Sequence, residues 1–185
     1  MKISLITTLV LLAITHTIAQ PKMSEYYFYV SSKIPDGDSG IGLFSLDTVS
    51  GKLSFLKEFK QVSSSSYLAL SATGENLYTV TQPEGEAEGE ISAFYILDGG
   101  TALELINKRS SMGNNPCYVS ISNNGNFLLT ANYNQGNIGS YSIENEGFIG
   151  GNISNIYHSG SSVNRERQER PLPHMILPAP EGNIV

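Results

Sequence analysis

The chain contains an internal repeat with a period of about fifty residues, and this feature constrains its fold most. Residues 67–79 (YLALSATGENLYT) align with residues 118–130 (YVSISNNGNFLLT), so that Gly74 and Gly125 coincide. A third copy begins at Met175 (MILPAPEGN). A chain that repeats itself at this spacing is built from supersecondary units stacked against one another.

A second element recurs between these copies and predicts β-strands. Residues 43–46 (LFSL), 93–96 (AFYI) and 140–143 (SYSI) alternate apolar or aromatic residues with small or polar ones, and each runs into a turn rich in Gly, Asp or Asn. That alternation has the period of a strand. Each repeat has room for four strands, which is typical of one blade of an all-β propeller. A solenoid is the competing architecture, but it has a shorter period of about 20 to 30 residues.

The number of repeats is too small for a closed ring. At about fifty residues per blade, residues 20–185 supply about three blades, whereas propellers close with about four to eight. The fold class predicted is therefore an incomplete β-propeller of four-stranded blades. Either the sequence is the N-terminal portion of a longer protein, or its open strand edges pair with other chains in self-association.

The first nineteen residues have the pattern of an export signal. Lys2 supplies a positive start, residues 3–14 are mostly apolar, and residues 17–19 offer small side chains at the cleavage position. The apolar run is too short to span a bilayer. We therefore expect a signal peptide over 1–19, a partial propeller domain over 20–185, no membrane span, and an exported protein that is periplasmic or secreted.

Charge and motif content exclude several functions. Lys and Arg number 11 against 17 Asp and Glu, for a net charge of −6, so no basic face is available for nucleic acid. The chain has neither a nucleophile elbow nor a phosphate-binding glycine loop, and its histidines do not follow zinc-ligand spacing. We expect no metal site and no cofactor. The single cysteine, Cys117, has no partner for an internal disulfide and is expected to be a small buried residue.

One long loop differs from the rest of this acidic chain. Residues 158–174 carry three arginines and both histidines that lie outside the signal, His158 and His174. The repeat alignment places His174 over Cys117 and Ser66, at the entry of each innermost strand. In a propeller these entries converge around the central axis, so residues far apart in sequence meet there. The pattern predicts a shared pocket at that end.

The residue types in this loop suit hydrolysis of an anionic ester or lactone. Arginine binds a carboxylate or phosphate through two parallel hydrogen bonds and can stabilise an oxyanion, and histidine can take a proton from water. The alternative is purely structural. In that interpretation Arg165 and Arg170 are solvated charges paired with Glu166 and Glu169, and His174 caps a strand.

Four segments together resemble a known family. Residues 115–120 (NPCYVS), 125–133 (GNFLLTANY), 158–162 (HSGSS) and 167–174 (RQERPLPH) are similar to the lactonase family of seven-bladed propellers. Its best-known activity is 6-phosphogluconolactonase, and related propellers include cyclising enzymes that make muconate lactones. The resemblance implies a whole protein about twice this length.

The resemblance also implies working residues and a substrate. Arg167 and His174 are the candidate catalytic residues. The candidates for substrate binding are Asn132, Tyr133, His158 and Gln168. The implied substrate is a small sugar lactone, and because sugar phosphates are mainly cytosolic, export favours an unphosphorylated aldonolactone or another oxidised sugar.

The sequence departs from the family pattern at two positions near the predicted pocket. Family members carry Pro-His-x-His where this chain has Pro171-Leu172-Pro173-His174, and they commonly carry His where Tyr118 stands. Tyrosine and leucine are better suited to stacking or apolar contact than to proton transfer. They favour a second hypothesis, a noncatalytic exported propeller that binds a carbohydrate or a protein.

Overall fold

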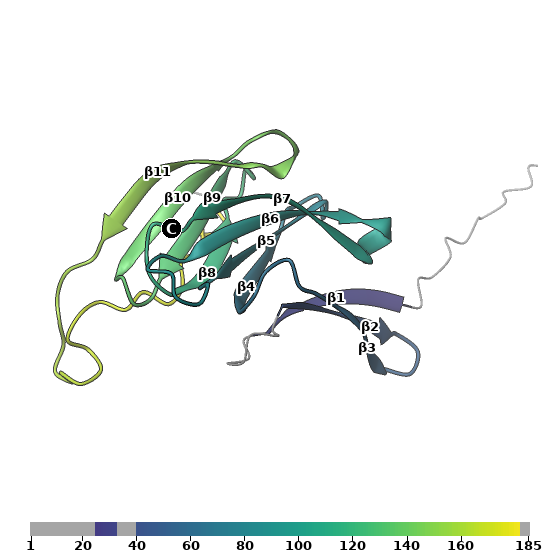
Figure 1. The fold of residues 1–185 in the computed structure, drawn as a ribbon, viewed down its shortest axis with the longest axis horizontal. Helices are drawn as coiled ribbons and strands as arrows, with labels where there is room; N and C mark the ends of the chain where they lie inside the picture. The colour runs from purple at the N-terminus through teal and green to yellow at the C-terminus, as the bar shows by residue number, and fades with distance from the viewer. Residues whose placement is uncertain (1–24, 33–39, 182–185) are drawn as a thin grey trace, which may run out of the picture.

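The computed structural model describes residues 25–32 and 40–181. The predicted signal peptide and the start of the predicted domain lie outside these residues. Within them, the chain forms three antiparallel sheets (Figure 1). The first sheet has the order β1-β2-β3, formed by β1 (Glu25–Ser31), β2 (Ile41–Asp47) and β3 (Leu53–Phe59).

The second and third sheets have four strands each. The second is formed in order by β4 (Ser65–Leu70), β5 (Asn76–Thr81), β6 (Glu90–Leu97) and β7 (Ala102–Ser110). The third is formed in order by β8 (Pro116–Ile121), β9 (Phe127–Asn132), β10 (Asn137–Ile143) and β11 (Ile149–Tyr157). Short 3-10 turns, η1 (Asp98–Gly100) and η2 (Asn145–Gly147), precede the last strand of each four-stranded sheet.

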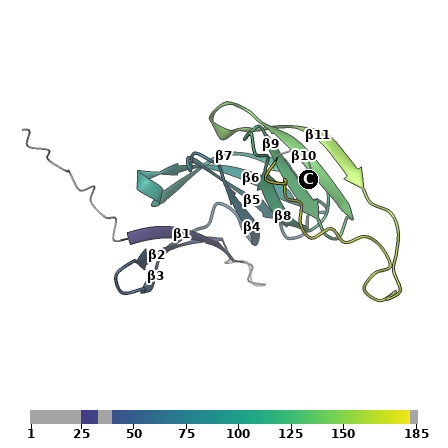
Figure 2. The same cartoon turned by 180° about the vertical axis from the view of Figure 1, so that it is seen from behind.

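The sheets fan out from their innermost strands. β4 packs closely on β8 and lies beside β1, whereas the outermost strands β7 and β11 barely touch. Figure 2 shows the same arc from behind. Within each sheet, every strand pairs with the next one in sequence, as the repeat predicts, so the all-β prediction of stacked propeller blades is confirmed. No helix in the described parts of the chain has the length and apolar character needed to cross a membrane.

The same turn opens both four-stranded sheets. Gly74 and Gly125 have φ of +74° each, and the N–H of each glycine donates to the carbonyl of the serine three residues earlier, at 2.9 Å for Ser71 and 2.8 Å for Ser122. A side chain at positive φ crowds its own backbone, so glycine is favoured there. The repeated glycine therefore sets the turn between the innermost strand and its neighbour.

Two apolar clusters hold the three sheets together. Because side chains alternate along a strand, each sheet in the middle of a stack must present an apolar residue set on both faces. The first and second sheets share one cluster, formed by Ile41, Leu43, Phe59, Val62, Leu77, Phe94 and Leu103. The second and third sheets share another, formed by Tyr78, Val80, Ile91, Ala93, Val119, Leu128, Tyr141 and Ile149.

The third copy of the repeat docks without joining a ladder. Residues 174–180 carry no strand assignment, although they run beside β8. The hydroxyl of Ser120 donates to the carbonyl of Ile176 at 2.7 Å, and Nδ2 of Asn123 donates to the carbonyl of Ala179 at 2.7 Å. The segment occupies the place of the next innermost strand, but the described residues include no sheet for it to pair with.

Replacing Gly125 tests the backbone requirement of this turn. No atom lies within 4 Å of a Cβ added there, so Gly125→Ala should lower the free energy of unfolding only through its positive φ, by about 1–2 kcal/mol. Gly125→Asn should lose less, because asparagine tolerates this conformation. The measurement is urea denaturation. Gly151→Ala, in an open position of β11 without positive φ, is the matched control and should leave stability unchanged or slightly raised.

Candidate functional site

The loop after β11 folds back on the turn between β9 and β10 and borders an open hollow of about 530 Å³. Arg167, Gln168 and His174 lie on its wall together with Tyr133 from the end of β9. The other wall residues are Ser159, Gly160, Ser161, Ser162, Arg170, Pro171 and Leu172. The structure thus brings four of the six predicted site residues to one place.

A compact turn presents Arg167 and Gln168. The side-chain oxygen of Asn164 accepts from the N–H of Glu166 at 3.2 Å and of Arg167 at 3.3 Å, and its carbonyl accepts from the N–H of Gln168 at 2.6 Å. The N–H of Ser162 closes the turn by donating to the carbonyl of Gln168 at 2.9 Å. Asparagine initiates such turns by bonding its own backbone two residues on. Asn164 therefore sets the position of Arg167, although the sequence analysis did not single it out.

The other end of the loop is held by close contact with a glycine. Gly136, in the turn between β9 and β10, has φ of +77°, and a Cβ there would lie 3.0 Å from the carbonyl oxygen of Pro171. Any larger residue would strain the turn and push the loop outward. This contact brings His174 to Tyr133, with ring centroids 5.7 Å apart in an edge-on arrangement.

A second hollow, of about 370 Å³, lies at the entry of the innermost strands. Ser66, Cys117 and His174 all line it, which confirms the prediction that these repeat-equivalent positions converge. Ser31, Ser65, Asn115 and Tyr133 complete its wall. Because Tyr133 and His174 line both hollows, the two rings stand between the loop and the axis of the arc.

The loop hollow is electropositive. Its wall carries the guanidinium groups of Arg167 and Arg170 and no carboxylate. In the parts of the chain that the structure describes, no ion pair involves an arginine of this loop. The alternative in which Arg165 and Arg170 pair with Glu166 and Glu169 is therefore not what the structure shows. Two solvated guanidiniums on one wall suit a ligand with an anionic group.

Asn132 does not lie on the wall of either hollow. Its side chain is fully buried, and its Nδ2 donates to the carbonyl of Ser111 at 2.9 Å. As the last residue of β9, it alternates with Tyr133 and points into the loop that precedes β8. In this structure Asn132 holds the backbone beside the pocket, and its assignment to substrate binding stays a prediction.

The locations of His158 and Cys117 in the structure also differ from those that the sequence analysis expects. His158 is exposed, and its backbone N–H donates to the carbonyl of Gly136 at 2.9 Å, but its side chain does not line the loop hollow. Cys117 is only partly buried, with its Sγ 3.5 Å from the carbonyl oxygen of His174. The thiol thus touches the backbone of the candidate catalytic residue, which fixes the edge of the axial hollow.

Tyr118, which stands where the family commonly has histidine, stacks on Tyr67. Their ring centroids lie 4.1 Å apart at an interplanar angle of 33°. The neighbouring Tyr67 side chain, followed by partial burial, raises the pKa of Tyr118 to about 12. A phenol with so high a pKa keeps its proton near neutral pH and cannot replace a histidine as general base.

Sequence reasoning missed two contributors to the site. Arg170 lines the loop hollow beside Arg167, and Asn164 organises the turn. The asparagine two residues before a Glu-Arg pair was a usable turn signal. Nothing in the sequence separates Arg170, which lines the hollow, from Arg165, which does not, because both are loop arginines of the same composition.

Comparisons with known proteins agree with this architecture. A family profile described as "Lactonase, 7-bladed beta-propeller" matches residues 27–185. A Bacillus subtilis (strain 168) protein named 6-phosphogluconolactonase is 31% identical over 163 residues, which cover 88% of this chain and 46% of the relative.

Solved structures agree in fold. A Bacteroides fragilis protein provisionally named 6-phosphogluconolactonase superposes with a TM-score of 0.79 at 30% identity, over 89% of this chain and 45% of that chain. A periplasmic gluconolactonase from Pseudomonas aeruginosa superposes with a TM-score of 0.77 at 21% identity, over 86% of this chain and 46% of its own. The chain thus spans about half the length of these relatives. By its repeat, its stacked sheets and this match, the chain belongs to the lactonase family of seven-bladed β-propellers.

Proposed function

We propose that this chain forms part of an enzyme that hydrolyses a sugar lactone at the hollow between residues 158–174 and Tyr133. The observation that carries the proposal is that Arg167 and His174 line one electropositive hollow without a carboxylate. The B. subtilis relative bears the name of a lactonase. Because this chain covers about half of that relative, the activity is proposed for the whole protein.

Each step of the reaction has a side chain suited to it. His174 would take a proton from water as its oxygen attacks the ring carbonyl carbon, and Arg167 would stabilise the negative charge that develops on the carbonyl oxygen. Collapse of this tetrahedral intermediate breaks the bond to the ring oxygen. That oxygen takes up the proton, and the product is the open hydroxy acid. Tyr133, edge-on to His174, would hold the imidazole in place.

The remaining polar groups of the hollow would recognise the substrate. Gln168 carries both donor and acceptor atoms for sugar hydroxyls, and Arg170 adds a second guanidinium for an anionic group of the sugar. Neighbouring serines, from Ser159 to Ser162, supply further hydroxyls on the same wall. A wall of this kind suits a polyhydroxylated ligand with a negative charge more than an apolar ester.

Export would decide which sugar reaches the site. The predicted signal over residues 1–19 and the periplasmic location of the similar P. aeruginosa gluconolactonase support an exported protein. Outside the cytosol, sugar phosphates are scarce. We therefore propose as the substrate an unphosphorylated aldonolactone, which is neutral, or the lactone of another oxidised sugar that keeps a free carboxylate in place of the phosphate.

Two substitutions on the wall of the hollow test the catalytic assignment. His174→Ala and Arg167→Ala in the full-length gene product should each lower kcat/KM for glucono-1,5-lactone by about 10²-fold or more, because each removes a group that acts in the transition state. A pH-indicator assay of acid release measures this.

Arg165→Ala is the matched control for this experiment. Arg165 belongs to the same loop and has the same charge, but it does not line the hollow, so its loss should leave kcat/KM within about twofold. Equal activity of wild type, His174→Ala and Arg167→Ala would remove both residues from the mechanism.

A second candidate function, binding without turnover, rests on the two positions that depart from the family. Tyr118 keeps its proton, and Leu172 places an apolar side chain on the wall of the hollow. A propeller with these residues could bind a carbohydrate by stacking and leave it unchanged. Sugar binding by calorimetry without any lactone hydrolysis would favour this function.

Restoring a histidine discriminates the two functions. If the site is catalytic, Leu172→His should raise kcat/KM severalfold, because a second imidazole in the hollow adds a proton acceptor. If the site only binds, Leu172→His should weaken binding and create no turnover above the spontaneous rate. The measurement compares initial rates of lactone hydrolysis with Leu172→Gln, which is polar but does not titrate.

A further inference from the structure

Two buried asparagines at the base of the β9–β10 hairpin form a cluster that lies outside the proposed mechanism. Asn132 ends β9, Asn137 begins β10, and the two are paired across the ladder. Both are 0% exposed. Nδ2 of Asn132 donates to the carbonyl of Ser111 at 2.9 Å, and Nδ2 of Asn137 donates to the carbonyl of Met112 at 3.0 Å. The two amides therefore hold consecutive carbonyl groups of the loop between β7 and β8.

That loop has a backbone that needs such support. Met112 has φ of +55°, a conformation that methionine rarely adopts. The next residue, Gly113, packs directly on the amides, because a Cβ there would lie 2.6 Å from Nδ2 of Asn132 and would also crowd Oδ1 of Asn137. Nδ2 of Asn155, on β11, donates to the same Met112 carbonyl at 3.2 Å. The loop thus keeps its shape through contacts with asparagine side chains of the third sheet.

The far end of the same loop is tied to the candidate site. The carbonyl of Asn115 accepts from the N–H of Tyr133 at 3.0 Å, and the carbonyl of Asn114 accepts from the N–H of Gln135 at 3.3 Å. Asn115 also lines the axial hollow together with His174, and the Tyr133 ring lies edge-on to the imidazole. A path of direct contacts therefore runs from the buried amides through the loop to the ring that contacts His174.

Stacking of the sheets does not require these asparagines. The equivalent pair of positions in the second sheet holds Thr81 and Glu90, and Glu90 forms an ion pair with Lys108 at 2.8 Å. In the third sheet, Oδ1 of Asn132 and Oδ1 of Asn137 are buried with no hydrogen-bond partner among the described residues, which costs free energy. A pair that packing can do without, and that is costly to bury, points to a role in placing the loop.

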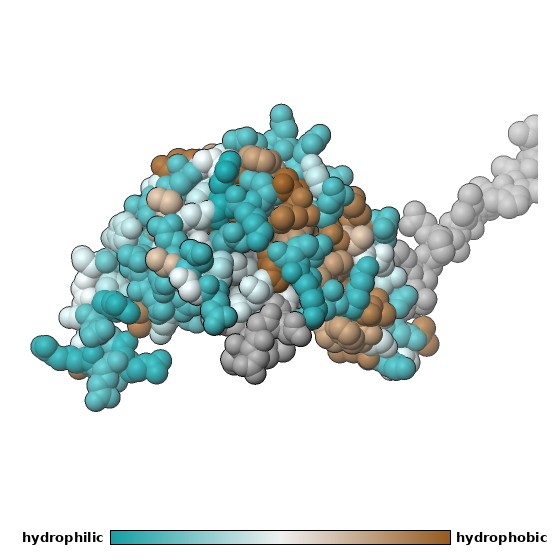
Figure 3. Space-filling view, viewed as in Figure 1, coloured by the Kyte–Doolittle hydropathy of each residue, from teal (hydrophilic) through white to brown (hydrophobic). Residues whose placement is uncertain are grey.

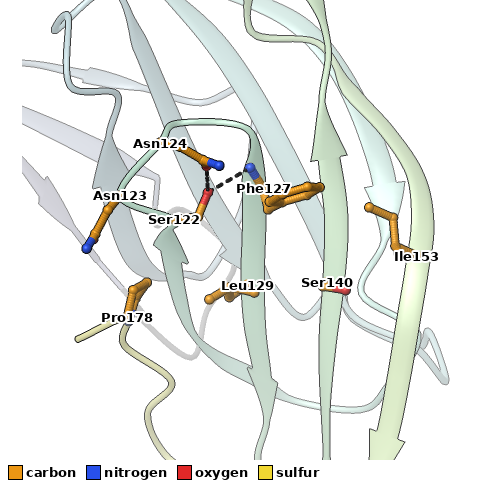
Figure 4. Close-up of a pocket in the computed structure, with 8 residues that line it drawn as sticks. All are labelled: Ser122, Asn123, Asn124, Phe127, Leu129, Ser140, Ile153 and Pro178. Carbon is orange, nitrogen blue, oxygen red and sulfur yellow. Dashed lines mark hydrogen bonds between the residues drawn. The ribbon is translucent and has the colours of Figure 1, made fainter. Parts of the chain in front are cut away.

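Polar side chains elsewhere on the third sheet are placed differently. Figure 3 shows mostly hydrophilic residues on the visible surface over β10 and β11. In the turn before β9, Oδ1 of Asn124 accepts from the hydroxyl of Ser122 at 2.7 Å, and Asn124 is exposed (Figure 4). Water competes for such bonds, whereas the bonds of Asn132 and Asn137 to the loop are shielded from it.

We propose that Asn132 and Asn137 are positioning residues for the lactone hydrolysis proposed at the loop hollow, on which this inference rests. Their amides would hold the loop between β7 and β8, the loop would hold the backbone of Tyr133, and the Tyr133 ring would hold His174 for proton transfer. The contacts among the amides, the loop and Tyr133 involve only the second and third sheets, each of which has four strands. Loss of either amide would move the imidazole relative to the reacting atoms and lower the rate.

Removal of each amide in the full-length gene product tests this role. Asn132→Thr introduces the residue that the second sheet carries at this position, and Asn137→Ser removes the other amide. Each should lower kcat for glucono-1,5-lactone about tenfold and leave KM within about twofold, because the imidazole moves while the wall that binds substrate stays. Hydrogen exchange at the Tyr133 amide should be about tenfold faster, since its hydrogen bond to Asn115 loosens.

Asn76→Thr is the matched control. Asn76 is 8% exposed at the start of β5, and its Nδ2 donates to the carbonyl of Glu146 at 3.2 Å, so it also joins the second sheet to the third. This bond lies at the opposite end of β5 from the hollows. Its loss should lower the melting temperature to a similar extent, but kcat should stay within about twofold and exchange at the Tyr133 amide should not change.

A double-mutant cycle identifies the route of the effect. In Tyr133→Ala, which lacks the ring that contacts His174, Asn132→Thr should lower kcat by less than about twofold further. Equal losses of kcat in Asn132→Thr and Asn76→Thr, or full additivity with Tyr133→Ala, would overturn the positioning role while lactone hydrolysis stands. If circular dichroism shows that Asn132→Thr does not fold, Asn137→Ser carries the same comparisons. Absence of lactone hydrolysis by wild type would overturn the proposed function, and this inference with it.

Discussion

Face-to-face packing of successive sheets is the interaction on which the rest of this structure depends. Each strand alternates its side chains, so the second sheet can bury Phe94 against the first sheet and Tyr78 against the third at the same time. The apolar clusters between the sheets are thus shared by two sheets each. The stack therefore fixes where every innermost strand begins, and with it the axis of the arc.

The candidate site is a consequence of that stacking. Ser66, Cys117 and His174 lie far apart in sequence, yet they line one hollow because each precedes an innermost strand at the same end of the stack. Two local features then hold the loop that carries Arg167 beside Tyr133. These are the turn organised by Asn164 and the close contact between Gly136 and Pro171.

Face-to-face packing also explains the exposed apolar side chains on the two outer sheets. A blade made of one sheet is apolar on both faces, so a stack of sheets that is not closed into a ring leaves one apolar face at each end. In relatives of about twice this length, the repeat supplies more sheets. In the described residues, Phe28 and Ile156 are exposed because no further sheet lies over them.

The sequence by itself determined the modular all-β fold, the glycine turns at Gly74 and Gly125, and the convergence of Ser66, Cys117 and His174, because period, alternation and backbone preference are local properties that a repeat makes visible. Only the tertiary structure decided that Asn132 is buried, that Arg170 rather than Arg165 lines the hollow, and that Tyr118 stacks on Tyr67. These outcomes depend on how a loop folds back and on how neighbouring sheets meet. The spacing of residues along the chain encodes neither the path of the loop nor the contact between the sheets.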